Sequence, residues 1–392
     1  MGLNSPITPN EIGGIWVYEK PKNLLFSYTL LIFATRLPPT PMFSTLREVL
    51  DHNRQTQNPY LDLGKLGLIG NEPELDELKT FEWVETLVFS NVWWEFDEKK
   101  NEWVKRQSQN IGEPNQLTSL PTHPPQLKQF ILAGDYYNPF KISDISFLKD
   151  LTNLTNLDLR NNQLSDISFL SGLSALTTLE LTYNKISDIS FLKDLTNLTN
   201  LDLSWNQISD ISFLKDLTNL TNLDLSNNEI SDISFLSGLT GLTSLNLWYN
   251  QISDISFLQG LSALTTLELH SNKISDISFL SGLRGLTSLN LGSNQISDIS
   301  FLKELKGLTN LYLSNNQISD FSALKELKGL TNLHLRTNQI SDISFLKELK
   351  NLTLLNLSKN KIKHFSLIFL NSLPNLKELY LEGNPIQNIF LM

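Results

Sequence analysis

The chain contains no cysteine among its 392 residues, which excludes disulfides, thiolate zinc sites and catalytic thiols. It also lacks a basic excess, because 31 Lys and Arg stand against 41 Asp and Glu, for a net charge of -10. Nucleic-acid binding needs clustered Lys and Arg, so this balance argues against it and favours a partner of basic character.

A long hydrophobic run is missing as well. The most apolar stretch, residues 24–34, is shorter than the roughly 20 residues that span a bilayer. The segment before it carries Glu11 and Glu19 rather than the basic residues of an export signal. We therefore expect no membrane span and a cytoplasmic location, with secretion as the alternative.

Catalytic signatures are absent from the sequence. Its 5 histidines are far apart and show no His-Glu-x-x-His or comparable metal spacing. No Gly-x-Ser-x-Gly nucleophile elbow occurs, and residues 64–67 lack the spacing of a phosphate-binding loop. We expect no enzymatic activity, no cofactor and no bound metal.

Asparagine recurs every 22 residues through the C-terminal two thirds of the chain, and each copy closes the phrase Leu-x-Leu-x-x-Asn. The copies are Asn162, Asn184, Asn206, Asn228, Asn250, Asn272, Asn294, Asn316, Asn338 and Asn360. An unbroken repeat of this length predicts a solenoid, in which each unit buries its apolar face only against its neighbours. We interpret these residues as a structural asparagine ladder, because amides at an inward turn can satisfy backbone groups of adjacent units.

One repeat unit illustrates the expected fold. The alternation of Leu201 and Leu203 predicts a short strand with its leucines in the core, and successive strands should stack as a parallel sheet. The pair Ser209 and Asp210 predicts an N-cap for a helical turn over 211–214. The fold class is therefore an α/β solenoid, a horseshoe with a parallel sheet on the concave side and short helical turns on the convex side.

Phenylalanine occupies one position of the expected helical turn in most units, namely Phe147, Phe169, Phe191, Phe213, Phe235, Phe257, Phe279, Phe301 and Phe345. We expect these rings to form a stacked spine under the convex side, so that Phe213→Ala costs about 3 to 5 kcal/mol. Ala323 interrupts the series, and Phe321 is expected to refill part of that volume.

Three parts can be distinguished along the chain. Residues 1–42 match no repeat, and they are interpreted either as disordered or as untranslated, with Met42 as the start. Residues 43–138 should hold a cap helix followed by degenerate repeats with insertions, and 139–392 the regular solenoid. One insertion carries Trp93, Trp94 and Trp103, which either pack it onto the cap or extend a contact surface.

The ten regular units resemble leucine-rich repeats of the 22-residue class, similar to those of internalins and of the regulatory subunit of protein phosphatase 1. The resemblance covers about residues 139–392 and implies a leucine-rich repeat horseshoe that binds proteins. The region 43–140 resembles bacterial leucine-rich-repeat proteins related to the Roco GTPases, through Leu61-Asp62-Leu63-Gly64 and the tryptophan-bearing insertion. The GTPase motif itself is missing.

Near-identical units supply an internal comparison. In residues 192–213 the two residues before the asparagine are Ser204 and Trp205, whereas the following near-duplicate has Ser226 and Asn227 there. Differences between copies concentrate on these two positions, which should leave the strand on its concave side.

Aromatic and acidic residues gather at these outward positions. Tyr183, Trp205, Trp248 and Tyr249 should lie within about 15 Å on four neighbouring strands, and such residues are enriched at interaction hot spots. Beside them runs a carboxylate series, Asp158, Glu180, Asp202, Asp224 and Glu268, suited to steering a basic partner. The alternative is that exposed positions have simply drifted.

We predict a non-enzymatic protein-protein interaction module that binds a protein or peptide partner on its concave face, as a monomer. One alternative is a sensor or regulatory arm for a separately encoded GTPase or signalling protein. Another is a secreted internalin-like adhesin. The sequence names neither the partner nor its pathway.

Overall fold

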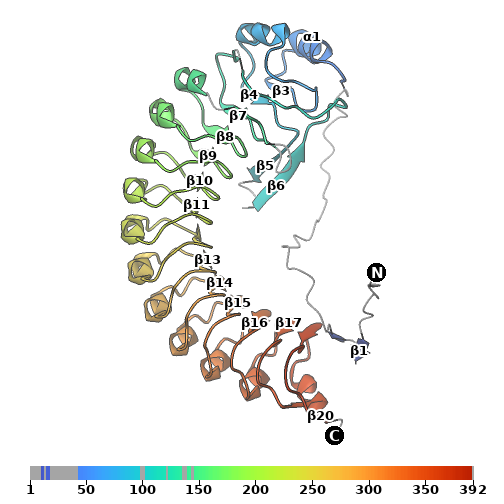
Figure 1. Ribbon diagram of the computed structural model, residues 1–392, viewed down its shortest axis with the longest axis vertical. Coiled ribbons are helices and arrows are strands. Elements are labelled where there is room, and N and C mark those ends of the chain that lie inside the picture. Colours follow the sequence, from blue (N-terminus) through green and yellow to red (C-terminus); the bar gives the residue numbers. More distant parts are fainter. Residues whose placement is uncertain are drawn as a thin grey trace, which may run out of the picture. The chain divides into compact units, whose positions relative to one another are not determined.

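The computed structural model describes residues 10–12, 15–17, 43–97, 102–120, 122–134, 139–142 and 145–390. The chain divides into two compact units, a first unit of Ile32–Ile230 and a second unit of Ser231–Met392 together with Met1–Leu31. Within each unit, short strands form one side and helical turns the other (Figure 1).

The first unit is built on parallel strands that pair with their neighbours in chain order. They are β3 (Tyr60–Asp62), β4 (Thr86–Val88), β7 (Gln129–Ile131), β8 (Asn156–Asp158), β9 (Thr178–Glu180), β10 (Asn200–Asp202) and β11 (Asn222–Asp224). The first three come from the segment expected to hold degenerate repeats, and Leu61, Leu87 and Phe130 are buried like the repeat leucines.

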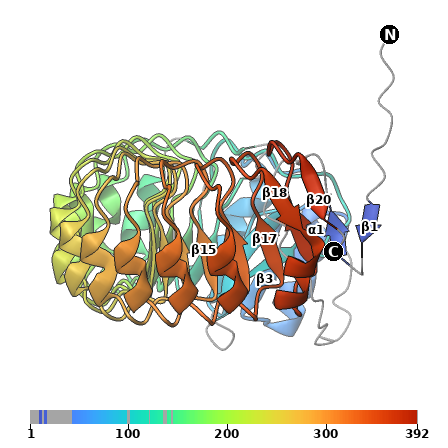
Figure 2. The same cartoon turned by 90° about the horizontal axis from the view of Figure 1, so that it is seen from below.

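The second unit repeats this arrangement. Its parallel strands are β12 (Ser244–Asn246), β13 (Thr266–Glu268), β14 (Ser288–Asn290), β15 (Asn310–Tyr312), β16 (Asn332–His334), β17 (Leu354–Asn356) and β19 (Glu378–Tyr380). A separate pair, β18 (His364–Ser366) and β20 (Asn388–Phe390), is also parallel (Figure 2). The strand β2 (Ile15–Val17) pairs with β19 and with β1 (Asn10–Ile12), while the rest of the unassigned segment 1–42 lies outside the described residues.

Short 3-10 turns return the chain between strands. In the first unit they are η1 (Pro73–Thr80), η2 (Ser146–Asp150), η3 (Ser168–Gly172), η4 (Ser190–Asp194) and η5 (Ser212–Leu214). In the second unit they are η6 (Ser234–Gly238), η7 (Ser256–Gly260), η8 (Ser278–Gly282), η9 (Ser300–Glu304), η10 (Ser322–Glu326), η11 (Ser344–Glu348) and η12 (Leu367–Ser372).

Each turn begins one residue later than the sequence predicts. The turn η5 starts at Ser212, and Ile211 rather than Asp210 precedes it. Asp210 still holds the turn, because its Oδ1 accepts a hydrogen bond from the Ser212 amide at 2.9 Å. The same bond from Ser190 lowers the pKa of Asp188, so the repeated aspartates stabilise these turns mainly as charged acceptors.

The predicted phenylalanine spine is not a continuous buried stack, because only Phe191 and Phe345 of its members are buried. Phe257 and Phe301 are each 37 % exposed, and Phe213 is half-buried. A 3-10 turn has three residues per turn, so Ile211 and Leu214 share the inner side and are buried, while the phenylalanine between them faces outward. The expectation for Phe321 holds, since this ring is buried and stacks on Phe345 at 5.7 Å.

The segment expected to cap the solenoid contains the helix α1 (Leu46–Thr56). Thr45 and Glu48 form a capping box, in which the Glu48 amide donates to Thr45 Oγ1 and the Thr45 amide donates to Glu48 Oε2. Leu46, Val49 and Leu50 are buried, as their helical spacing predicts.

The tryptophan-bearing insertion is an antiparallel hairpin of β5 (Val92–Asp97) and β6 (Glu102–Gln107). Trp93 is 5 % exposed, which favours the packing interpretation for this residue. The side chains of Trp94 and Trp103 lie outside the described part of the chain. In the residues that the structure covers, no helix is long and apolar enough to cross a membrane.

Candidate functional site

The side of each unit formed by its strands is called the strand face here, and one repeat shows how it is built. Leu201 and Leu203 point into the core and are at most 2 % exposed. Strand alternation therefore turns Asp202 and Ser204 to the opposite side. The residue after Ser204 also leaves the core, since Trp205 is 38 % exposed. The strand face thus carries the third strand residue and the two residues that precede the ladder asparagine.

The asparagine after these positions closes the turn with its amide. Asn206 Nδ2 donates to the Leu181 and Leu203 carbonyls, both at 3.0 Å, and Asn206 Oδ1 accepts from the Ile186 amide at 3.0 Å. All ten ladder asparagines donate to the leucine carbonyl three residues earlier. The ladder therefore connects backbone groups within and between repeats, and it fixes the direction of the residues just before it.

The residue immediately before each ladder asparagine has a left-handed backbone. Its φ lies between 51° and 57° at Asn161, Tyr183, Trp205, Asn227, Tyr249, Ser271, Ser293, Asn315, Thr337 and Lys359. Asparagine tolerates this conformation, whereas a bulky side chain in it costs on the order of 1 kcal/mol. Aromatic residues therefore occupy these sites against the local backbone preference. This argues against the alternative that the sequence at these exposed positions has drifted freely.

In the first unit, two of the predicted aromatic residues contact each other. The rings of Tyr183 and Trp205 stack with centroids 4.6 Å apart and planes 21° apart. We call them the stacked pair. Neighbouring repeats place Asn161 and Asn227 at the same backbone position, so the pair is a local feature of β9 and β10.

In the second unit, Trp248 and Tyr249 are adjacent in sequence and meet edge to face at 6.4 Å. Trp248 also stacks on His270 at 6.1 Å. Tyr249 is 58 % exposed. The four predicted aromatic residues are therefore divided between the two units. In each unit, the two predicted residues contact each other.

The carboxylates of the first unit form a row, called the acidic column here, of Asp158, Glu180, Asp202 and Asp224. Strand register places each one beside the next. Their surroundings differ. Asp158 is buried and ion-paired with Arg160, whereas Asp202 and Asp224 are half-buried and accept hydrogen bonds from the Ser204 and Ser226 amides at 2.8 Å.

Glu180 is the most unusual member of the acidic column. It is 3 % exposed, and its Oε1 has no hydrogen-bond partner among the described residues. Burial and the neighbouring Asp202 carboxylate raise the pKa of Glu180 well above its ordinary value, against the opposing charge of Arg160. The steering role expected of the whole column therefore narrows to Asp202 and Asp224.

Glu268 occupies the same strand position in the second unit. Burial raises its pKa to about 7, although a hydrogen bond from the Asn290 side chain acts in the opposite direction. Glu268 is therefore only partly ionised at neutral pH.

Sequence reasoning gave little weight to Tyr312, His334, Arg336 and Glu382, but the structure brings them together in pairs. Tyr312 and His334 stack at 4.7 Å, and Arg336 lies 3.3 Å from Glu382. Burial lowers the pKa of His334 to about 4, so this ring is neutral at pH 7. Strand register contained the signal for Tyr312 and His334, since they occupy the same strand position in consecutive repeats.

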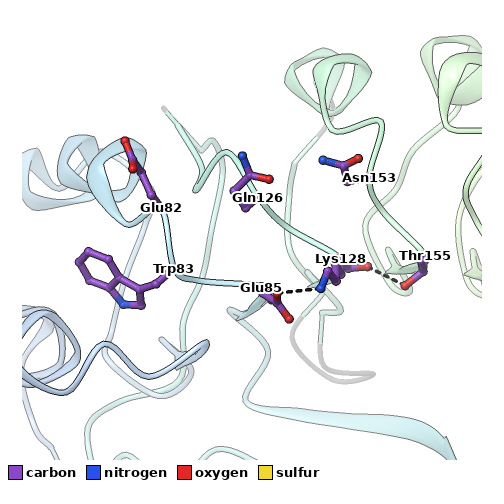
Figure 3. Close-up of a pocket in the computed structure, with 7 residues that line it drawn as sticks. All are labelled: Glu82, Trp83, Glu85, Gln126, Lys128, Asn153 and Thr155. Carbon is purple, nitrogen blue, oxygen red and sulfur yellow. Dashed lines mark hydrogen bonds and ion pairs between the residues drawn. The ribbon is translucent and has the colours of Figure 1, made fainter.

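A pocket of about 400 Å³ lies in the first unit and is lined by Glu82, Trp83, Glu85, Gln126, Lys128, Asn153 and Thr155. Figure 3 shows Lys128 bonded to both Glu85 and Thr155, through its ammonium at 2.7 Å and its carbonyl at 3.1 Å. The Trp83 indole donates to Asn53 at 2.8 Å. Most of the lining side chains are exposed and polar, unlike the apolar walls of small-molecule sites.

The described residues do not meet the requirements of a metal-binding site. No three His, Asp or Glu side chains there are grouped so that they could hold a metal ion. The strand face instead offers aromatic rings, carboxylates and backbone-bonded hydroxyls, a set suited to protein contacts.

Comparisons with known proteins agree with this architecture. A family model described as "Leucine Rich repeats (2 copies)" matches residues 125–172, 174–216, 218–260, 262–304 and 306–348, and a second, "Leucine rich repeat", matches 339–386. The chain belongs to the leucine-rich repeat family. Leucine-rich repeat proteins of the internalin and receptor type are generally protein-interaction modules.

The solved structures that resemble this chain include an internalin (inlF) of Listeria monocytogenes. It is 38% identical to this chain with a TM-score of 0.57, and the match covers 65% of this chain and 81% of the internalin chain. A leucine-rich repeat protein of Leptospira interrogans is 26% identical with a TM-score of 0.71, over 89% and 90%. The plant peptide hormone receptor RGFR1, 22% identical with a TM-score of 0.60 over 79% and 53%, shares the fold. No curated protein matches the chain.

Proposed function

We propose that this chain is a non-enzymatic interaction module that binds a protein or peptide of basic character on its strand face. The contacts are assigned to Tyr183 and Trp205 in the first unit and to Trp248 and Tyr249 in the second. The observation that carries the proposal is that the exposed rings of Trp205 and Tyr249 occupy left-handed backbone positions, where asparagine would be more stable.

The acidic residues give this surface its preference for a basic partner. Asp202 and Asp224 are accessible enough to attract cations, whereas Asp158, Glu180 and Glu268 contribute less charge at neutral pH because they are paired or buried. Charges of this kind raise association rates more than they raise affinity. Partner binding should therefore weaken at high salt.

The test is affinity capture from native lysate with the full chain and with Trp205→Ala/Trp248→Ala. The double variant should recover at least tenfold less of the captured partner, because truncation of an aromatic hot spot costs about 2 kcal/mol or more. Phe257→Ala/Phe301→Ala is the matched control, since it removes two exposed rings from the 3-10 turns. Equal recovery by all three proteins would exclude the proposed surface.

A second candidate is an internalin-like adhesin outside the cell, favoured by the 38% identity to the Listeria internalin. Antibody labelling of intact native cells, compared with permeabilised cells, separates the two locations. Labelling only after permeabilisation would exclude the adhesin. The regulatory role for a GTPase and the Roco resemblance of 43–140 stay predictions.

A further inference from the structure

The acidic column already binds one guanidinium, which belongs to the chain itself. Arg160 Nε donates to Asp158 Oδ1 at 2.9 Å, and Arg160 Nη2 donates to Asp158 Oδ2 at 2.5 Å. Two parallel bonds of this kind are the strong geometry for a guanidinium on a carboxylate. The strand face of the first unit is therefore shaped to hold an arginine side chain along its carboxylates.

The next two carboxylates have no such cation. Glu180 and Asp202 follow Asp158 in strand register, and the repeat position of Arg160 is taken by Thr182 and then by Ser204. Among the ion pairs of the described residues, none includes Glu180 or Asp202. Arg160 acts electrostatically on both carboxylates, but neither of them has an ion pair of its own among the described residues.

Glu180 supplies an independent indication of a ligand. Its carboxyl group is buried in the column, and Oε1 accepts no hydrogen bond from the described residues. A buried acceptor without a donor destabilises the folded chain. A guanidinium N–H arriving beside it would remove that cost.

The stacked pair belongs to the same two repeats as Glu180 and Asp202. Trp205 follows Asp202 by three residues and is 38 % exposed, and its ring stacks on Tyr183. Guanidinium groups bind the faces of aromatic rings as well as carboxylates, whereas an ammonium lacks the planar fork that does both. Arginine is therefore the side chain that uses all of these groups together.

We propose that an arginine side chain of the partner binds Asp202 beside the stacked pair, and that its charge ionises Glu180, whose proton is released to solvent. This inference rests on the proposed function and specifies the chemistry of the partner.

The proton release follows from the charges that surround Glu180. Asp158 acts on it from β8, Arg160 from just after β8, Asp202 from β10 and Asp224 from β11. Burial and the three aspartates raise the pKa of Glu180, while Arg160 alone opposes them. A second guanidinium would add to the effect of Arg160 and offset the repulsion from Asp202, so the ionised form becomes stable.

The experiment is isothermal titration of the full chain with acetyl-Gly-Arg-Gly-Arg-Gly-amide and with the same peptide carrying citrulline for arginine. Titrations run between pH 5.5 and 8.5 at constant ionic strength, in phosphate and in Tris, whose ionisation enthalpies differ. The arginine peptide should bind at least tenfold more tightly than the citrulline peptide. Below the pKa of Glu180 it should release about one proton, and its affinity should rise about tenfold per pH unit.

Two variants and one control connect these effects to the residues. Glu180→Gln keeps the volume of the neutral acid, so it should abolish both proton release and the pH dependence of affinity. Asp202→Asn should weaken arginine-peptide binding at least tenfold. Glu326→Gln, at an exposed position of the 3-10 turn η10, should change neither, and circular dichroism confirms that each variant is folded.

Proton release that persists in Glu180→Gln would overturn the inference, as would equal binding of the two peptides. Failure of the wild-type chain to bind the arginine peptide would also overturn it. The proposed function would survive any of these results if partner capture still depends on Trp205 and Trp248. Loss of that dependence refutes the proposed function separately.

Discussion

Replacing Trp205 by asparagine should separate binding from stability. Trp205 has φ 54°, and the equivalent residue of the next repeat, Asn227, has φ 52°, as Asn161 two repeats earlier has φ 56°. The substitution therefore places a residue that the chain itself uses at this backbone position. It removes the indole ring and leaves the ladder bonds of Asn206 in place.

The expected stability change is small because two effects oppose each other. Relief of the left-handed strain contributes on the order of 1 kcal/mol. Loss of the ring contact with Tyr183, at 4.6 Å, costs about 0.5 to 1.5 kcal/mol. The free energy of unfolding should therefore change by less than about 1 kcal/mol, whereas partner affinity should fall about 30-fold, corresponding to about 2 kcal/mol.

Urea unfolding followed by circular dichroism measures the first quantity, and titration of the captured partner measures the second. Leu203→Ala is the matched control for stability, because Leu203 is fully buried in the same repeat and its truncation should cost about 2 to 5 kcal/mol. A Trp205→Asn protein as unstable as Leu203→Ala would refute the backbone argument. Unchanged affinity would refute the assignment of Trp205 to the binding surface.

Three further predictions concern the scaffold. The pKa of Glu268 is about 7 in the folded state, above the ordinary value of 4.5 that it has in the unfolded chain. Between these two pH values the folded state binds more protons than the unfolded state. The free energy of unfolding should therefore fall as pH rises from 4.5 to about 7. Glu268→Gln should remove about 2 kcal/mol of this pH-dependent loss of stability. The prediction is contradicted if the urea midpoints of the wild-type and variant proteins change with pH in the same way. In urea unfolding, Phe213→Ala should cost about 1 kcal/mol and Leu214→Ala at least about 2 kcal/mol, because only the leucine is fully buried. Equal costs for the two variants would indicate that Phe213 is buried after all. Asn206→Ala should cost about 3 kcal/mol, because it leaves buried carbonyls without donors, whereas exposed Gln207→Ala should change the melting temperature little.

The strands and turns could be predicted from sequence because they depend on local periodicity. Leucines at alternate positions before a fixed asparagine specify both the strand and its inward face, as Leu201 and Leu203 show. The helical turn was less predictable. Its 3-10 geometry changes the period from 3.6 to 3, and this difference moved Phe213 from the predicted core to a half-exposed position.

The backbone strain at the candidate site could not be predicted from residue type. Tyrosine and tryptophan both favour extended backbone, yet Tyr183 and Trp205 have φ 55° and 54°. The next residue imposes this conformation, because Asn206 must turn inward to reach the Leu181 carbonyl of the preceding repeat. A tertiary hydrogen bond therefore determines the conformation of an exposed residue.

The uneven charge of the acidic column, by contrast, was readable from sequence. Residues two apart on a strand share a face, so Arg160 can pair with Asp158, whereas Ser204 at the same position gives Asp202 no cation from its own repeat. Glu180 lies next to this boundary and follows the same rule, since Thr182 offers it no charge. Near-identical repeats thus differ in charge because of the residue two positions after the carboxylate. The repeats of β9 and β10 lack a cation at that position, and the proposed arginine of the partner would supply it.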